Sequence, residues 1–135
     1  MALNLEGIYQ SMVRQFRTST SDDAFQADFV AAINNVLDQM NFIADASTNL
    51  AHISNHNGSV SGLETEHSFI VTRGVVTELI LAGRKHRDDT AWSIAMQAWD
   101  VALGQYQTML MRDKQDAVDD DGVPTEDIVG LGYQG

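Results

Sequence analysis

Apolar residues recur at intervals of three and four along four stretches of the chain, a spacing that predicts four α-helices. The first stretch carries its stripe at Leu5, Ile8, Met12 and Phe16, widened by Tyr9 and Val13. The second is expected to begin at Asp22 and Asp23, because carboxylates suit the N-cap and the positive end of the helix dipole. It runs to about Ala46, with apolar positions at Phe25, Phe29, Ile33, Val36, Leu37 and Met40.

The third stretch, from Leu63 to about Arg84, is apolar on several sides, which predicts a central helix with neighbours all round it. Ser61 and Glu64 have the spacing of a capping box at its start. Gly74 costs a helix about 1 kcal/mol relative to alanine, so its place in the middle of this helix indicates that another backbone approaches closely there.

The fourth helix is expected to start at residues 88–90 and to end near Met111. Its apolar residues follow the heptad spacing of a packing seam: Trp92, Ala95, Trp99, Ala102, Tyr106 and Met109. Ile94, Ala98 and Val101 form a second ridge beside this seam. Because the seam holds two tryptophans and a tyrosine, it should give the largest burial in the chain.

The segment between the second and third helices, residues 47–62, has no helical periodicity. Asn57 and Gly58 favour a two-residue turn, so a short β-hairpin or an extended arm is expected. Loops of this length often carry function, which makes its apolar residues candidates for contact with a partner: Leu50, Ile53 and Val60. A plain surface loop is the alternative.

Residues 112–135 differ from the rest, with seven acidic residues, two basic ones and several glycines. Gly122 and Pro124 end any helix there. Four apolar residues nevertheless remain near the end, and such residues can anchor an extended peptide in a partner's groove: Ile128, Val129, Leu131 and Tyr133. The alternative is a tail folded back on its own helices. The predicted architecture is therefore all-α, with a four-helix bundle domain at 1–111, a long loop, and an acidic extended C-terminal arm at 112–135.

The formal net charge of −11 disfavours direct DNA binding, which needs clustered cations, but it is compatible with an acidic wall that repels a passing duplex. The chain has no cysteine, which excludes disulfides and thiolate chemistry. No apolar run approaches the roughly 20 residues that span a bilayer, and the first residues lack the pattern of a signal peptide. We therefore expect a soluble, unsecreted protein with no membrane partner.

Candidate catalytic and metal motifs are weak. Glu64 and His67 form one Glu-x-x-His, but di-iron bundles need two such motifs and further carboxylates from two other helices. The favoured interpretation of Glu64 is a helix cap. His52 and His56 lie four apart where no helix is expected, and the run of acids at 119–121 lacks the pattern of a calcium loop. No enzyme activity, metal or cofactor is expected.

Arg84, Lys85 and Arg87 form the one dense basic cluster in the sequence. They can cap the negative end of the third helix, or they can pair with acidic residues of a neighbouring subunit. Candidate acids for such a subunit interface are Asp119, Asp120 and Asp121.

The order of these features resembles the head-to-tail adaptor, or connector, proteins of tailed bacteriophages. The resemblance rests on the run DFVAAINNVLD at residues 28–38, the irregular segment that follows, the Gly62-Leu63-Glu64 entry into a central helix, and the closing helix from Trp92 to Tyr106. It covers about residues 20–111, has no invariant catalytic motif, and does not extend to the first helix. The acidic C-terminus is also similar to that family, in which the tail reaches into the portal ring.

This resemblance implies a homo-oligomeric ring, typically dodecameric, that sits in the virion neck beneath the portal protein and is assembled in the host cytoplasm. The ring extends the DNA channel, lets DNA pass without specific binding, and offers a platform for tail or stopper proteins. The arm at Ile128, Val129, Leu131 and Tyr133 would dock on the portal. An alternative from another class is a cytosolic helical regulatory or protein-binding module, a small oligomer that associates through the seam from Trp92 to Met109.

Overall fold

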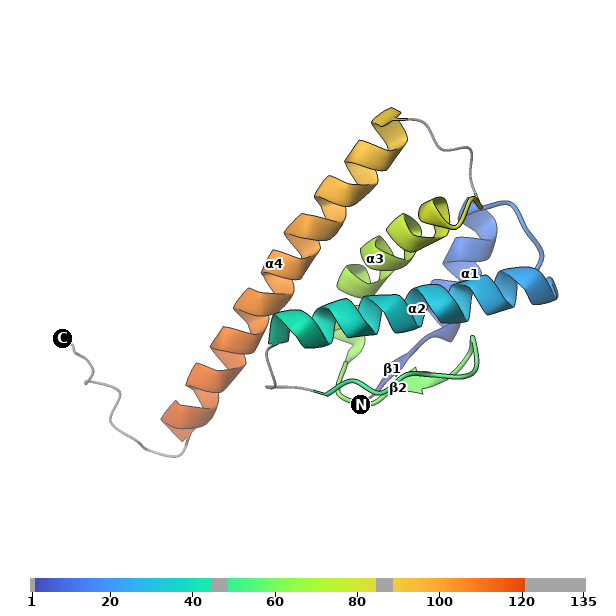
Figure 1. Ribbon diagram of the computed structural model, residues 1–135. Helices are drawn as coiled ribbons and strands as arrows, with labels where there is room; N and C mark the ends of the chain where they lie inside the picture. The colour runs from blue at the N-terminus through green and yellow to red at the C-terminus, as the bar shows by residue number, and fades with distance from the viewer. Residues whose placement is uncertain (1, 45–48, 85–88, 121–135) are drawn as a thin grey trace.

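The computed structural model describes residues 2–44, 49–84 and 89–120, including every side chain there except those of Asp89 and residues 114–120. Within these ranges the chain forms four α-helices: α1 (Glu6–Gln15), α2 (Asp23–Ala44), α3 (Ser68–Leu81) and α4 (Asp89–Asp120). A short 3₁₀ helix, η1 (Thr65–His67), precedes α3, and two short strands, β1 (Leu3–Asn4) and β2 (Ser59–Val60), complete the described elements (Figure 1). The predicted helical character is confirmed.

Helix α3 lies at the centre, in contact with α2, α4 and α1. Its residues Ile70, Val71, Val75 and Leu79 are fully buried, as its apolar character on several sides predicts. A Cβ atom on Gly74 would stand 2.7 Å from Val36 of α2 and 2.8 Å from Trp99 of α4. The close approach expected at this glycine is confirmed, although the neighbours are side chains and not a second backbone.

Most of the predicted seam of α4 packs inward, although Trp92 at its start is only half-buried. Ala95, Trp99, Ala102 and Tyr106 are all buried, and Met109 packs partly against the same core. The indole N–H of Trp99 donates to Oε1 of Gln39 at 2.7 Å, so the ring is buried with its polar atom bonded.

The start of α2 is capped as the sequence predicts. Oδ1 of Asp22 accepts a hydrogen bond from the backbone N–H of Phe25 at 3.1 Å, and Oδ2 accepts one from the hydroxyl of Thr18 at 2.8 Å. The bonds from Thr18 and from Phe25 lower the pKa of the Asp22 carboxyl below its usual range, because both stabilise the charged form.

The capping box expected at Ser61 and Glu64 is wrong by one turn. Glu64 is itself the N-cap, of η1, and the box is closed with His67, whose Nδ1 accepts from the backbone N–H of Glu64 at 2.9 Å. The physical reason is that Ser61 and Gly62 lie in a turn, with Gly62 at φ +97, so the chain is not yet helical where the sequence predicts its first turn.

Helix α3 ends earlier than predicted, at Leu81, in a Schellman motif. Gly83 adopts φ +85, its N–H donates to the carbonyl of Ile80, and the N–H of Arg84 donates to the carbonyl of Leu79. The same motif ends α1, but there the left-handed residue is Arg17, at φ 56. An arginine pays the steric cost that glycine avoids at this position.

The segment after α2 is held against that helix by polar side chains spaced four and three apart. Asn34 bonds both the N–H and the carbonyl of Ile53, at 2.8 and 3.1 Å, and Asn41 does the same for Leu50, at 2.7 and 2.9 Å. Between them, Asp38 bonds Nε2 of His52 at 2.7 Å. These side chains give the loop the backbone partners that a β-strand would otherwise provide.

The β-hairpin expected around Asn57 and Gly58 is absent from the described residues. A turn does occur there, closed by a bond from the N–H of Gly58 to the carbonyl of Asn55. Strand β2, however, pairs antiparallel with β1, and Leu3 lies opposite Val60. The residues before the turn are already bonded to α2, so the N-terminal strand supplies the partner (Figure 1).

Helix α4 continues to Asp120, past its predicted end at Met111. Residues 112–120 are therefore helical and not part of an extended arm. The segment Arg112-Asp113-Lys114-Gln115 contains good helix formers, and the residues that break helices come only with Gly122 and Pro124. The rest of the predicted arm, residues 121–135, lies outside the described residues.

Candidate interaction surface

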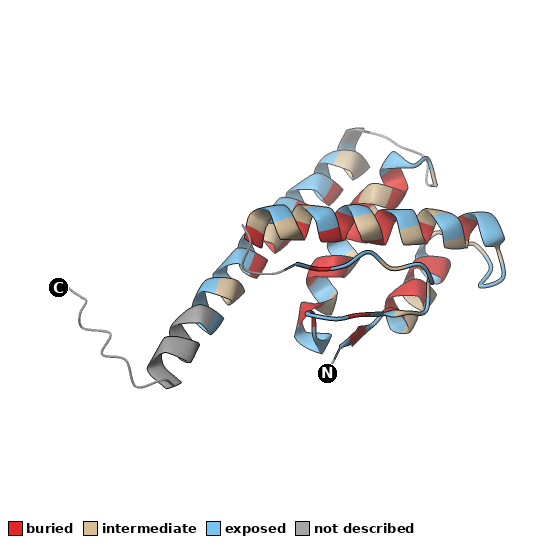
Figure 2. Cartoon of the chain, turned by 60° about the horizontal axis from the view of Figure 1, so that its bottom comes forward, coloured by how far each residue is buried: buried red, intermediate tan, exposed pale blue. Residues whose placement is uncertain are grey.

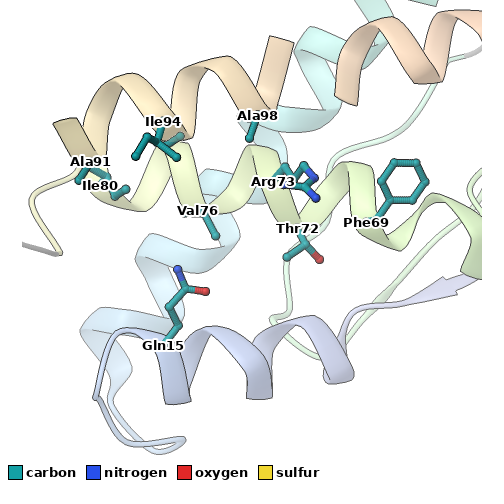
Figure 3. A pocket seen from close by; sticks show the side chains of 10 residues that line it. Gln15, Phe69, Thr72, Arg73, Val76, Ile80, Ala91, Ile94 and Ala98 are labelled. Atoms are coloured by element: carbon teal, nitrogen blue, oxygen red, sulfur yellow. The ribbon is translucent and has the colours of Figure 1, made fainter. Parts of the chain in front are cut away.

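A groove of about 590 Å³ opens between α3 and α4, with the end of α1 at its edge (Figure 3). Its walls are mainly apolar, and its lining consists of Gln15, Phe69, Thr72, Arg73, Val76, Ile80, Ala91, Ile94, Ala95 and Ala98. Helix α2 passes behind α3 and α4 in this view, so the groove opens away from α2. We refer to it as the α3–α4 groove.

A second hollow of about 460 Å³ continues the α3–α4 groove along α4. Its lining shares Phe69 with the first and adds Val101, Gly104, Gln105, Thr108 and Met109. From Ala91 to Met109 the two hollows follow α4 over about 27 Å, at 1.5 Å per residue. Single exposed apolar side chains are common on proteins, whereas a continuous apolar surface of this length is typical of a site that contacts another molecule.

The second ridge of α4 forms one wall of these hollows. Ile94 is 62% exposed and Val101 is 61% exposed, while Ala98 between them is half-buried. Together with Ala91, Gln105 and Thr108 they repeat at intervals of three and four, which is the same heptad spacing as the buried seam. Helix α4 thus has two packing faces, and the chain's own helices cover only one of them (Figure 2).

Helix α2 carries a separate apolar feature, the side chain of Phe42, which is 85% exposed. It belongs to the outer stripe of the helix, with Ala31, Asn35 and Asp38, all of which are exposed. A phenylalanine normally buries most of its surface in a domain of this kind. The surface around Phe42 is therefore a candidate contact for another molecule.

The charges differ between these two features. Arg73 is exposed and lines the α3–α4 groove. The stripe of Phe42 carries the exposed carboxylate of Asp38, and Glu78 of α3 reaches the same helix, where it accepts hydrogen bonds from Asn35 and Gln39. The groove is thus cationic at one wall, and the surface around Phe42 is anionic.

The three loop residues predicted to contact a partner are placed in this chain's own interior. Leu50 is 3% and Val60 is 1% exposed, and Ile53 packs partly against the same core. The bonds from Asn41 and Asn34 hold Leu50 and Ile53 in place, and pairing with β1 holds Val60. In this conformation Leu50 and Val60 stabilise the chain and offer no surface to a partner.

Of the predicted subunit-interface cations, Arg84 is described and is engaged within the chain. Its Nε bonds Oδ2 of Asp28 at 2.5 Å, and its guanidinium lies 5.3 Å from the centre of the Phe25 ring. Lys85, Arg87 and Asp121 lie outside the described residues, as do the side chains of Asp119 and Asp120 and the arm residues Ile128, Val129, Leu131 and Tyr133.

The three histidines among the described residues have structural partners. His52 bonds Asp38, His56 packs on the Tyr9 ring with 4.3 Å between ring centroids, and His67 closes the cap of η1 and contacts Tyr106. In the part of the chain that the structure describes, no three histidine, cysteine or acidic side chains gather closely enough to hold a metal ion. No helix among the described residues has the length and apolar character needed to cross a membrane.

Sequence reasoning singled out the second ridge of α4 but not its exposure, and it missed Phe42 altogether. The signal for Phe42 was present, because it follows Asp38 by four residues on a polar stripe and breaks the inner pattern of α2. No protein-family model, curated protein or solved structure matches this chain.

Proposed function

We propose that this protein is a structural subunit of the neck of a tailed bacteriophage, a head-to-tail adaptor that forms a ring beneath the portal. The observation that carries the proposal is the length of uncovered apolar surface along α4, where Ile94 and Val101 stand exposed beside the α3–α4 groove. A chain that folds around one face of its longest helix and leaves a second packing face open is suited to assembly with other subunits.

The specific assignment to the neck comes from the sequence resemblance at residues 20–111. In this proposal the four helices act as a bundle that packs side by side between subunits. The C-terminal arm docks on the portal through Ile128, Val129, Leu131 and Tyr133, and Lys85 and Arg87 pair with acids near the end of α4 in a neighbouring subunit. The ring is dodecameric, and the protein has no catalytic role.

The net charge of −11 supports the part of the proposal that concerns DNA. A duplex that leaves the head must slide through the ring without being held. Acidic side chains along a channel repel phosphates, and a chain with so few clustered cations cannot release counterions as a DNA-binding protein does. The ring therefore extends the channel without trapping its contents.

The competing class, a small regulatory oligomer, depends on the seam from Trp92 to Met109 as its dimer surface. Trp99 and Tyr106 on that seam are 5% and 1% exposed within a single chain. Most of the seam that this alternative needs at an interface is thus buried within the chain, with Trp92 and Met109 half-buried, whereas the ridge at Ile94 and Val101 is exposed and favours the assembly subunit.

Light scattering of the purified chain mixed with the portal protein of the same phage tests the proposal. We expect a complex heavier than the portal by about a dozen copies of the chain. The chain without portal is the control. Its oligomeric state does not test portal binding, because a ring subunit can remain monomeric until it meets the portal. A portal peak of unchanged mass contradicts the proposal.

A further inference from the structure

Two of the uncovered apolar features among the described residues, the α3–α4 groove and the side chain of Phe42, lie on different sides of the chain. On α3, Gly74 faces Val36 of α2, whereas Arg73 and Val76, one and two positions away, line the α3–α4 groove. Phe42 is on the outer stripe of α2, and α2 lies behind α3 and α4 when the groove is viewed from the front (Figure 3). The groove and Phe42 therefore cannot meet within one chain.

We propose that the α3–α4 groove binds Phe42 of a second copy of this chain. The groove offers apolar walls at Val76 and Ile94, and the described residue with the most exposed large apolar side chain is Phe42, at 85%. An aromatic side chain that enters an apolar pocket is the usual anchor of a protein interface. Each copy has one such anchor and one such pocket.

The charges beside the two features match. Arg73 stands at the wall of the groove, and Asp38 precedes Phe42 by four residues, which places its side chain about 5–6 Å away on the same helix face. A Phe42 side chain seated in the groove brings this carboxylate toward a guanidinium. In a chain of net charge −11, such a pair also offsets part of the repulsion between copies.

The contact joins two unlike surfaces, so it is head to tail and leaves a free Phe42 at one end and a free groove at the other. Contacts of this kind close into a ring when the rotation between copies permits and otherwise continue as a filament, whereas a two-fold dimer would use the same patch twice. The inference names the subunit contact of the ring proposed above and rests on that proposal, although it is tested on the chain alone.

The chain has no native cysteine, so single cysteines report the contact without background. Asn35→Cys and Ala98→Cys place one thiol on the stripe of the anchor, two turns before Phe42 so that its ring is kept, and one on the groove lining. The two variants carry tags of different mass and are mixed at about 1 mM, where a contact of millimolar Kd is substantially occupied. A short bis-maleimide then links neighbouring thiols. We expect the mixed product, one copy of each variant, to exceed either homodimer at least about tenfold.

Two matched controls fix the geometry. Ala24→Cys lies on the same stripe of α2 as Asn35, three turns earlier, and Gln97→Cys adjoins Ala98 but is not part of the groove lining; both positions are exposed. Using the α2 control in place of the α2 thiol, or Gln97→Cys in place of Ala98→Cys, should lower the yield of the mixed product to that of random collision. A double variant with Asn35→Cys and Ala98→Cys should give a ladder of three and more copies.

A charge exchange tests the pairing. Asp38→Arg on the α2 cysteine variant alone, or Arg73→Asp on the groove cysteine variant alone, should reduce the cross-linked yield several-fold. When both changes are present, the facing charges are again opposite, and the yield should be restored. His52→Gln removes the other partner of Asp38 and should leave the yield unchanged.

Mixed product at the level of the Ala24→Cys control, or an Asn35→Cys homodimer as the main product, overturns the inference. Neither result bears on portal binding, which the light-scattering experiment measures with the wild-type chain. A portal complex without the head-to-tail cross-link would retain the proposed function and reject this contact.

Discussion

Gly74 of α3 and Trp99 of α4 are in direct contact, and a Cβ atom on residue 74 would stand 2.8 Å from the indole carbons Cη2 and Cζ3. The indole covers the glycine and is held in place by the bond from its N–H to Gln39 of α2. Three helices therefore meet at a position where the smallest residue is required. This contact fixes the orientation of α4, and with it which ridge of α4 remains exposed.

Gly74→Ala should destabilise the protein. The added methyl must displace both Trp99 and the Val36 side chain, at 2.8 and 2.7 Å, and overpacking of this kind costs typically about 1–3 kcal/mol, against about 1 kcal/mol gained in helix propensity. Urea unfolding measures the difference. Gly7→Ala is the control, since its Cβ meets nothing within 4 Å in α1, and it should stabilise. Equal gains at both positions would contradict the contact.

At the left-handed positions that follow α1 and α3, gain of a glycine should raise the stability of the protein and loss of a glycine should lower it. Gly83→Ala should cost about 1–2 kcal/mol, because alanine is strained at φ +85, although a Cβ there meets no atom within 4 Å. Arg17→Gly should stabilise the protein by about 0.5–1 kcal/mol, because glycine relieves the strain at φ 56. The gain is partly offset because glycine raises the conformational entropy of the unfolded chain. Thermal unfolding of both variants checks the signs, and two changes of the same sign would refute this interpretation.

Asn41→Ala should destabilise the segment that follows α2. It removes two hydrogen bonds and leaves the N–H and carbonyl of Leu50, a residue 3% exposed, without those partners, at a cost of about 1–3 kcal/mol. The amide hydrogens of residues 50 and 53 should also exchange faster with solvent. Asn49→Ala, an exposed position in the same segment, is the control. Unchanged exchange at Leu50 would show that Asn41 does not hold the loop.

Asp22 predicts a loss of stability in acid. Its pKa is lowered in the folded state, first by the Thr18 hydroxyl and then by the N–H of Phe25, so its contribution is present above the ordinary aspartate pKa of about 3.9 and is lost as pH falls through the lower folded value. Asp22→Asn keeps an acceptor oxygen but cannot titrate. The free energy of unfolding of this variant should fall less steeply below about pH 4 than that of the wild type. Parallel curves would exclude Asp22 as a source of the acid dependence.

Removal of residues 121–135 should abolish binding to the portal and leave the fold unchanged. The described core lies wholly before this segment, whereas the segment contains Ile128, Val129, Leu131 and Tyr133. Circular dichroism checks the fold, and co-sedimentation with portal rings checks binding. A variant with these four residues changed to serine separates their side chains from the length of the arm. A truncated chain that still sediments with the portal would remove the arm from the proposal.

The helices could be predicted from the sequence because their information is local. The stripe at Phe25, Phe29 and Ile33, the cap at Asp22 and the close approach at Gly74 each follow from spacing within one helix. The strand at Leu3 and Asn4 could not be predicted in this way, because its partner lies more than fifty residues away and the two-residue strands leave no alternating pattern.

The interaction surface was harder to predict than the fold. Periodicity identifies Ile94, Ala98 and Val101 as a ridge, but it cannot say whether another helix of the same chain covers that ridge. Leu50 and Val60 show the opposite error, since an apolar residue in a loop was expected to meet a partner and instead joins the core. The polar residues Asn34 and Asn41 of α2 place that loop through their bonds to Ile53 and Leu50, and helical periodicity does not predict such bonds.

An electron-microscope image of the wild-type chain bound to its portal ring tests the central claim most directly. The account predicts a second ring of density, coaxial with the portal, about twelve copies around and open along its axis. Portal particles without added density, or with scattered single copies in place of a closed ring, would contradict it.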